Sequence, residues 1–382
     1  MVLSYHDFEG VPADLAARAR AMRSTGAQVV KIAVMANELR DCIPLLGLGA
    51  RSGRDDGLVA IAMGEAGLAS RVLAGRFGSA WTYAGSERHV GQVAAETLVN
   101  DYHFKTLTGS TDAYGLLGNP VSHSVSPAMH NAAFAAGGHD AVYLPFPASS
   151  ADDFVSFADA LGIKGASVTT PYKVAMLDCV SEVQPVARRI GAINTVHATN
   201  GRWIGGNTDA TAFLQPLHNR VPLQGATAAV LGAGGAARAV AVALASSGAR
   251  VRVHARNCAQ AESVAVLASA ELGPWPPEPG SWDLLVNCTP VGMYPRIDET
   301  PLAANHLTGK YVYDLIYNPA ATRLMREATL AGCQAIGGLG MLVAQAQQQF
   351  EWWRGTRPPA GVMRSAALKR LSEFVHDEHH VV

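Results

Sequence analysis

The chain has 382 residues, of which 49% are hydrophobic and 16% are charged, and its formal net charge is −1. This length predicts two or three domains, and the composition is that of a globular protein. Because a nearly neutral chain sets up no field that attracts nucleic acid or an anionic membrane, we expect neither as a partner. A local cationic pocket for a small anionic metabolite remains open.

The cysteines and the apolar segments predict a cytoplasmic protein. The five cysteines are scattered and form no CxxC pair, so we expect reduced thiols and no bound metal. No apolar run approaches the ~20 residues that a membrane span needs. The first ten residues, MVLSYHDFEG, lack the basic start and apolar core of a signal peptide.

Residues 1 to about 105 alternate short apolar strands with helical stretches. Strands are expected at 29–36, 57–64 and 79–85, where VVKIAVMA, GLVAIAMG and SAWTYAG look like strands buried on both faces in a parallel sheet. Apolar spacing over 12–26 predicts a helix that stops at a glycine. Lys31 interrupts the first strand, and a lysine in an apolar run is a nucleophile, an ion-pair partner or the relic of a lost activity.

After a polar linker at 106–112, a second α/β region runs to about residue 220, with strands expected at 113–118, 141–146 and 165–171. Three serines, Ser122, Ser124 and Ser126, lie on a loop before a helix that Pro127 opens. Alternate hydroxyl groups near a helix start suit a carboxylate ligand. Ordinary capping of the helix by Ser126 is the alternative.

Polar residues follow the strands of this second region. Lys173 comes after the strand at 165–171, and Asn194, Asn207 and Asp209 lie on later loops. Loops after the strands of an open α/β sheet are where such sheets bind ligands. Lys173 would serve as an acid or base toward a carbonyl or hydroxyl group while Asp209 holds its proton. A purely structural ion pair between the two is the alternative.

The third region begins at 226–256, where a strand, a glycine turn, a helix and a second strand follow one another. Gly232, Gly234 and Ala237 form the GxGxxA pattern of a dinucleotide site, although a glycine turn without a ligand would look similar. An NAD site would carry Asp or Glu at the end of the second strand. Arg256 stands there instead and suits a 2′-phosphate, so we expect NADP as the cofactor.

From residue 114 onward the chain resembles shikimate dehydrogenase. The motifs NPVSHSVSP, SVTTPYK, GAINT, GGNTDA and GAGGAAR occur in that family's order, followed by NCTPVGM and GLGMLVAQA. The resemblance implies reversible, NADPH-dependent reduction of 3-dehydroshikimate to shikimate, a step toward chorismate in aromatic amino acid biosynthesis. A quinate or broad-specificity shikimate dehydrogenase is the nearest alternative.

The same resemblance implies the site residues. The catalytic pair would be Lys173 and Asp209. The substrate would be bound by Ser124, Ser126, Thr169, Asn194, Tyr317 and Gln345, and the cofactor by Gly232, Ala233, Gly234, Gly235, Ala236, Arg256, Asn257, Gly338 and Met341. Two positions depart from the family: a second basic residue near Arg256 is missing, and Ser167 stands where many members have Asn.

The first hundred residues resemble type I 3-dehydroquinase. The segments SYHDF, VVKIAVMA, MGEAGLASR, FGSAWTYA and VGQV occur in that family's order. The resemblance implies Lys31 as the Schiff-base lysine, His6 as the general acid and base, Arg71 as the carboxylate ligand and Gln92 as the residue closing over the substrate. The match covers only the C-terminal half of a (β/α)8 barrel, about four of its eight strands.

The expected fold class is therefore α/β with three parts. They are a partial (β/α)8 barrel at 1–105, an α/β substrate-binding domain at 113–222 to which 339–375 return, and a Rossmann NADP-binding domain at 223–338. We expect the half-barrel to be an inactive vestige, or a module for forming a homodimer. A bifunctional dehydroquinase–shikimate dehydrogenase, as in plants, is the alternative, with two half-barrels combining between chains.

Overall fold

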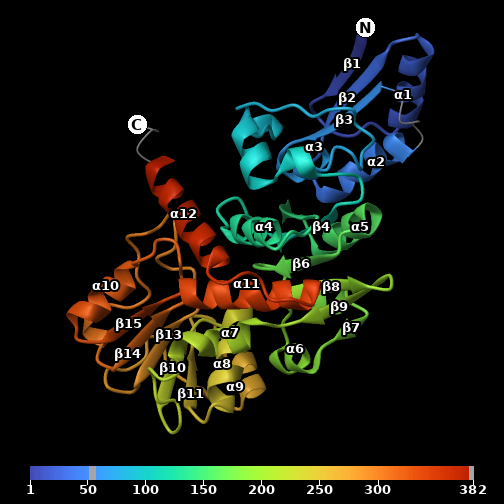
Figure 1. Ribbon diagram of the computed structural model, residues 1–382. Coiled ribbons are helices and arrows are strands. Elements are labelled where there is room, and N and C mark those ends of the chain that lie inside the picture. Colours follow the sequence, from blue (N-terminus) through green and yellow to red (C-terminus); the bar gives the residue numbers. More distant parts are fainter. Residues whose placement is uncertain (51–56, 378–382) are drawn as a thin grey trace. The chain divides into compact units, whose positions relative to one another are not determined.

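The computed structural model describes residues 1–50 and 57–377, and its contacts divide the chain into two compact units (Figure 1). The first unit comprises Met1–Ala175 and His197–Gly201, and the second comprises Met176–Val196 and the chain from Arg202 onward. The three-part division expected from the sequence stays a prediction.

The first unit begins with a parallel sheet of three strands in the order β1 (Val2–Asp7), β2 (Val29–Met35) and β3 (Gly57–Met63). Helices α1 (Leu15–Ser24) and α2 (Ile43–Ala50) connect these strands, and α3 (Leu68–Val72) follows β3. This β/α alternation in a parallel sheet is the expected partial-barrel arrangement. The strands predicted at 29–36 and 57–64 and the helix within 12–26 are confirmed.

The strand predicted at 79–85 is wrong. The backbone N–H of Ala80 donates to the carbonyl of Leu58 at 2.8 Å, and the Ser79 hydroxyl accepts from the N–H of Ala60 at 2.9 Å. Residues 79–85 then leave the edge of β3 without forming a ladder. The N-terminal region therefore has three strands among its described residues, and the expected number of about four is also wrong.

The rest of the first unit is built on β4 (Asp112–Gly118), which pairs in parallel with β5 (Ala141–Pro147) on one side and β6 (Gly165–Val168) on the other. Helices α4 (Ser126–Ala136) and α5 (Ala151–Leu161) make the connections. The three predicted strands are confirmed, although β6 ends three residues early. The Arg76 guanidinium joins this part to the N-terminal region by donating to the carbonyl groups of Leu161 and Thr111.

The second unit contains a six-stranded parallel sheet of the Rossmann type. Its strand order is β12 (Glu271–Leu272), β11 (Arg250–His254), β10 (Thr227–Leu231), β13 (Leu284–Asn287), β14 (Tyr311–Asp314) and β15 (Gln334–Gly337). Helices α8 (Gly235–Ser246) and α9 (Cys258–Ala268) pack on one face, and α10 (Arg323–Leu330) packs on the other. The strand, turn, helix and strand predicted over 226–256 are confirmed.

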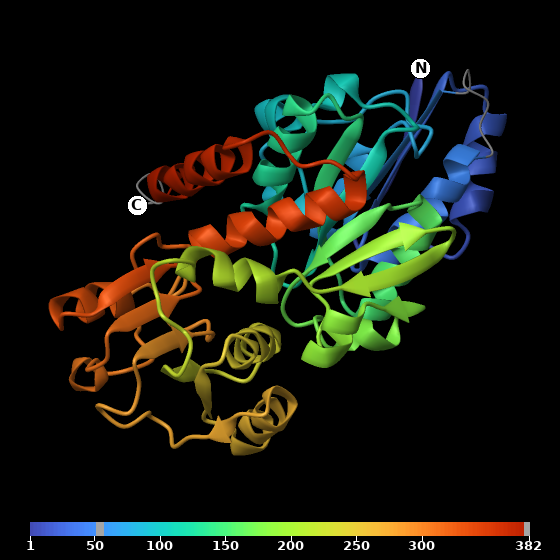
Figure 2. The ribbon, with the colours of Figure 1, turned by 60° about the horizontal axis from the view of Figure 1, so that its bottom comes forward.

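The second unit also contains β7 (Glu182–Val183), α6 (Pro185–Ile190), β9 (Arg202–Gly206) and α7 (Asp209–Leu214), and β7 pairs in parallel with β9. The residues of β8 (Thr195–Thr199) are divided between the units. The last two helices, α11 (Leu339–Arg354) and α12 (Val362–Asp377), are drawn in red in Figure 2. Across the described ranges, none of the helices has the length and apolarity that a membrane crossing requires.

Candidate active site

The glycine turn after β10 has the geometry of a dinucleotide loop. Gly232 has a φ of +108°, and its N–H donates to the carbonyl of His254 at 2.8 Å. A Cβ at this residue would lie 3.3 Å from the carbonyl oxygen of Cys288, so the conformation and the close packing both require glycine. Around Gly234 a Cβ would meet nothing within 4 Å, which leaves space beside the backbone for a ligand.

Helix α8 begins directly after this turn. Ala237 is fully buried against the sheet, while Ala233, Gly235 and Ala236 are only partly buried at the open end of the helix. The first N–H groups of a helix have no partner within the helix and attract anions. Ala233, Gly235 and Ala236, with Gly232 and Gly234, therefore fit the pyrophosphate of a dinucleotide.

The residues expected at the adenosine end follow β11. Arg256 is exposed two residues after the strand ends, where a guanidinium can reach a 2′-phosphate. The side chain of Asn257 accepts from the N–H of Gln260 at 3.1 Å and caps α9. Asn257 therefore has a structural task at the start of α9 besides its expected role toward the cofactor.

Gly338 and Met341 lie at the start of α11. A Cβ on Gly338 would be 2.0 Å from the carbonyl oxygen of Leu315, and its N–H donates to the carbonyl of Ile316 at 3.2 Å. The loop that carries the half-buried Tyr317 therefore lies directly against the α11 start. Met341 is 7% exposed and packs in the apolar core that α8 and α9 share with the sheet.

A buried polar network holds that loop. Asn287 and the N–H of Ile316 donate to Oδ1 of Asp314 at 3.0 and 3.1 Å, and Thr322 donates to Oδ2 at 2.6 Å. Burial raises the pKa of Asp314 to about 6, against these three hydrogen bonds, which favour the carboxylate. The motif NCTPVGM contains Asn287, but its partner Asp314 is 27 residues away and was not among the expected site residues.

Asn194 and Asp209, both expected in the site, are in direct contact. The amide group of Asn194 donates to Oδ1 of Asp209 at 2.8 Å and to the Thr208 hydroxyl at 2.9 Å, and its oxygen accepts from the N–H of Thr208 at 2.8 Å. Asn207 accepts from the N–H of Asp209 at 2.9 Å. Asn194 and Asp209 are 2% and 4% exposed, so the carboxylate is fixed in a protected position.

Helix α11 completes this network. Gln349 donates to the carbonyl of Asn194 at 3.1 Å, and the Thr208 hydroxyl lies 3.4 Å from the carbonyl of Gln345. The side chain of Gln345, a predicted substrate ligand, donates to the carbonyl of Leu342 at 3.0 Å. Thr208 and Gln349 were not among the residues expected from the sequence, although Thr208 lies within the motif GGNTDA.

The remaining predicted residues lie on two loops of the first unit, after β4 and β6. The N–H of Asn119 donates to the carbonyl of Thr170 at 3.1 Å, and that of Thr169 donates to Leu117 at 2.9 Å. These bonds bring the loop with Ser124 and Ser126 to the start of the segment with Lys173, which is half-buried. The Ser124 hydroxyl accepts from the N–H of Ser126 at 3.2 Å.

The alternative role of Ser126 as a helix cap is not what the structure has. Ser126 is the first residue of α4, and Val125 occupies the N-cap position. Lys173 belongs to the first unit and Asp209 to the second, so their pairing stays a prediction. Within residues 1–50 and 57–377, no three His, Cys, Asp or Glu side chains gather as a metal site would require.

The four dehydroquinase-like residues lie in the N-terminal region. His6 and Lys31 share one face of the three-stranded sheet, and partial burial lowers the pKa of His6, with a smaller contribution from Lys31. The Lys31 ammonium lies 4.3 Å from the centre of the Tyr83 ring. Arg71 is 3% exposed and donates to the carbonyl groups of Tyr83 and Val90 at 3.4 and 2.8 Å.

Gln92, the fourth of these residues, makes hydrogen bonds within the segment 79–93, which also contains Tyr83 and Val90. Its side-chain oxygen accepts from the backbone N–H of Glu87 at 3.2 Å, and its backbone N–H donates to the carbonyl of Glu87 at 3.1 Å. The segment 79–93 thus lies over Lys31 through Tyr83 and is held by Arg71.

Comparisons with known families match three parts of the chain. Residues 1–108 match the type I 3-dehydroquinase family, residues 116–196 the shikimate dehydrogenase substrate binding domain, and residues 338–368 the shikimate 5′-dehydrogenase C-terminal domain. A shikimate dehydrogenase (NADP(+)) of Symbiobacterium thermophilum is 44% identical over 284 residues, which are 70% of this chain and 97% of the relative.

A second relative matches nearly the whole chain. The chloroplastic bifunctional 3-dehydroquinate dehydratase/shikimate dehydrogenase of Arabidopsis thaliana is 32% identical over 94% of this chain. This chain spans only 64% of the plant enzyme's length. Among solved structures, shikimate 5-dehydrogenase of Thermus thermophilus, in complex with NADP(H) and shikimate, is 37% identical with a TM-score of 0.62, covering 68% of this chain and 99% of its own.

The buried carboxyl of Asp314 predicts a pH dependence of stability. Its pKa is about 6 in the folded protein against 3.8 for the ordinary group, so its protonated form stabilises the fold. That contribution is complete below pH 4 and is lost as the pH rises through 6, a change of about 3 kcal/mol.

We therefore expect wild type to lose stability between pH 4 and 7 relative to Asp314→Asn, which carries no titrating group at this position. The thermal unfolding midpoints of both proteins across this range measure the difference, with the exposed Asp298→Asn as the control. Parallel curves for wild type and Asp314→Asn would show that Asp314 ionises normally.

Proposed function

Because this chain belongs to the shikimate dehydrogenase family, we propose that it catalyses the reversible reduction of 3-dehydroshikimate to shikimate with NADPH. The observation that carries the proposal is the buried carboxylate of Asp209, which Asn194 holds at 2.8 Å at the start of α7. A carboxylate fixed in this way at the start of α7 can orient the ammonium group of a catalytic lysine, as the shikimate dehydrogenase motifs imply.

The loop residues supply the contacts that this substrate needs. Ser124 and Ser126 precede and begin α4, where hydroxyl groups and a helix N-terminus suit the carboxylate of shikimate. Thr169, Asn194 and Gln345 would bind its hydroxyl groups, and Tyr317 would contact the substrate. The glycine turn at 232–236, Arg256 and Asn257 would hold NADP, with Gly338 and Met341 along the nicotinamide.

The reaction needs a proton donor at the substrate carbonyl oxygen. NADPH, when bound, supplies the hydride that reduces the ketone carbon. Negative charge then grows on the oxygen, and the ammonium group of Lys173 stabilises this charge and donates the proton. Asp209 would orient Lys173, and Asn194, which also donates to Thr208, holds the Asp209 carboxylate in place.

We expect Lys173→Ala to lower the turnover of shikimate by ~10²-fold or more with nearly unchanged affinity for NADP. Steady-state kinetics with shikimate and NADP+ and a direct titration of NADP+ measure the two quantities. The control is Lys164→Ala, which removes an exposed lysine at the start of β6. A Lys173→Ala protein with wild-type turnover would contradict the assigned role.

We further propose that the N-terminal region does not turn over 3-dehydroquinate in this chain. The guanidinium of Arg71, which would bind the substrate carboxylate, donates instead to two backbone carbonyl groups of segment 79–93. The same segment puts the Tyr83 ring against the ammonium of Lys31. The four residues of a dehydroquinase site are present, but two of them, Arg71 and Lys31, contact this segment of the chain.

Borohydride trapping tests this proposal, because it fixes any Schiff base between Lys31 and a ketone substrate. The protein is incubated with 3-dehydroquinate and borohydride, digested and examined by mass spectrometry, with Lys31→Arg as the control. We expect no substrate-dependent mass on Lys31. An adduct on Lys31, together with dehydration of the substrate, would establish the bifunctional alternative.

The domain boundaries, the oligomeric state and the location of the protein are further proposals. We propose the division into a half-barrel at 1–105, a substrate-binding domain at 113–222 with 339–375, and an NADP-binding domain at 223–338. A homodimer through the half-barrel and a cytoplasmic location also stay predictions. The outer edge of β1 supports the homodimer, because β1 pairs only with β2 among the described strands and its other edge could pair with a second chain.

A further inference from the structure

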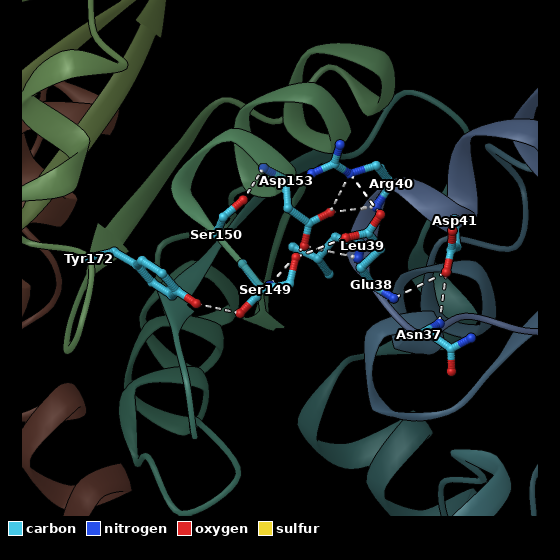
Figure 3. Close-up of polar contacts among 10 residues, drawn as sticks. Asn37, Glu38, Leu39, Arg40, Asp41, Ser149, Ser150, Asp153 and Tyr172 are labelled. Atoms are coloured by element: carbon cyan, nitrogen blue, oxygen red, sulfur yellow. Dashed lines mark hydrogen bonds and ion pairs between the residues drawn. The ribbon is translucent and has the colours of Figure 1, made fainter.

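The turn between β2 and α2 contacts α5 and the segment before it, which lie in the same unit beyond the N-terminal region (Figure 3). The N–H groups of Leu39 and Arg40 donate to the Asp153 carboxylate at 3.2 and 2.9 Å, and the Arg40 guanidinium lies 3.5 Å from it. Asp153, on α5, has no exposed surface. None of these residues belongs to the four dehydroquinase-like residues. A dehydroquinase site therefore does not explain the contact.

A second contact joins the turn to the segment before α5. Ser149 donates its hydroxyl to Glu38 at 2.9 Å and its N–H to Asp153 at 3.0 Å. Glu38 is held in place by Arg40, whose Nε is 2.9 Å from its carboxylate. Ser149 is therefore fixed on two sides, by Glu38 of the turn and by Asp153 of α5.

The residue before Ser149 meets both loops of the first unit that carry predicted site residues. The carbonyl of Ala148, which is fully buried, accepts from the Tyr172 hydroxyl at 2.6 Å and from the Asn119 side chain at 3.2 Å. Tyr172 immediately precedes Lys173, and Asn119 begins the loop with Ser124 and Ser126. One carbonyl group thus orients the lysine segment and the serine loop together.

We propose that the turn Asn37–Asp41 positions Lys173 for the dehydrogenase reaction, with Glu38 and Tyr172 as positioning residues at the two ends of the connection. The inference rests on the proposed function. It gives the N-terminal region, which resembles a dehydroquinase, a role in the shikimate dehydrogenase reaction. Ser149 transmits the position of Glu38 to Ala148 through one peptide bond, and Ala148 fixes the ring of Tyr172 beside Lys173.

The test compares variants that cut the connection at each end. Glu38→Ala removes the acceptor of Ser149, and Tyr172→Phe removes the bond to Ala148 but keeps the ring. Since a misplacement of about 1 Å costs up to ~10²-fold in rate, we expect each variant to lower kcat for shikimate about ten-fold. Affinity for NADP+ stays at the wild-type value. We expect the double variant to lose no more than the worse single variant, because both act through one connection.

Two further proteins separate positioning from general damage. Glu38→Gln keeps an oxygen that can accept from Ser149 and should recover most of the activity that Glu38→Ala loses. Glu65→Ala removes an exposed carboxylate from the N-terminal region and serves as the control. If Glu38→Ala fails to fold, Tyr172→Phe with its unchanged ring carries the test.

The outcomes distinguish the two proposals. Absence of shikimate turnover in wild type overturns the proposed function. If wild type turns over shikimate, the positioning role is overturned by an unchanged kcat in Glu38→Ala or in Tyr172→Phe, or by an equal loss in Glu38→Gln and Glu38→Ala. Additive losses in the double variant overturn the single connection and leave two independent effects.

Discussion

A carboxylate with no exposed surface needs partners where it lies, and in the first unit that carboxylate belongs to Asp153. Its hydrogen-bond donors are the N–H groups of Leu39, Arg40 and Ser149, and Leu39 is 114 residues away in the sequence. Removing one partner of such a buried group typically costs 3–5 kcal/mol, on the order of a third of a domain's stability. The N-terminal turn and α5 therefore form one structural unit.

This constraint changes how the partial barrel is understood. The described residues of this region form three parallel strands with the Lys31 ammonium against the Tyr83 ring, and they include none of the residues expected to bind shikimate or NADP. It nevertheless supplies donors that Asp153 needs, and Arg76 adds hydrogen bonds to Leu161 and Thr111. The N-terminal region therefore holds α5 and the segment at Thr111 in place through these hydrogen bonds.

Local signals predicted much of the fold. The apolar runs at 29–36 and 57–64 and the glycine turn at Gly232 depend on neighbouring residues, and their strands and turn are confirmed. The run at 79–85 has similar β-propensity, but Ser79 and Ala80 bond to the edge of β3 and the chain then turns away. Its conformation was decided by tertiary contacts, which override propensity.

Sequence motifs likewise identified only part of the candidate site. Sequence motifs identified Asn194 and Asp209 as candidates, and the structure adds the bond between them and the support from Thr208. Asp153 was not identified, because its donors Leu39 and Arg40 lie 114 and 113 residues away in the sequence. Asp314 was not identified either, because its bond to Asn287 spans 27 residues. Burial and hydrogen bonding, which only the fold defines, gave these two carboxylates their importance.

Amide hydrogen exchange of the full chain, with and without shikimate and NADP+, tests most directly whether the N-terminal turn and the substrate loops act together. Binding that orders the loops at 119–126 and 169–173 should also stabilise whatever holds them. The account predicts slower exchange in both loops and at the N–H groups of Leu39 and Arg40. Slower exchange in the loops alone, with Leu39 and Arg40 unchanged, would contradict it.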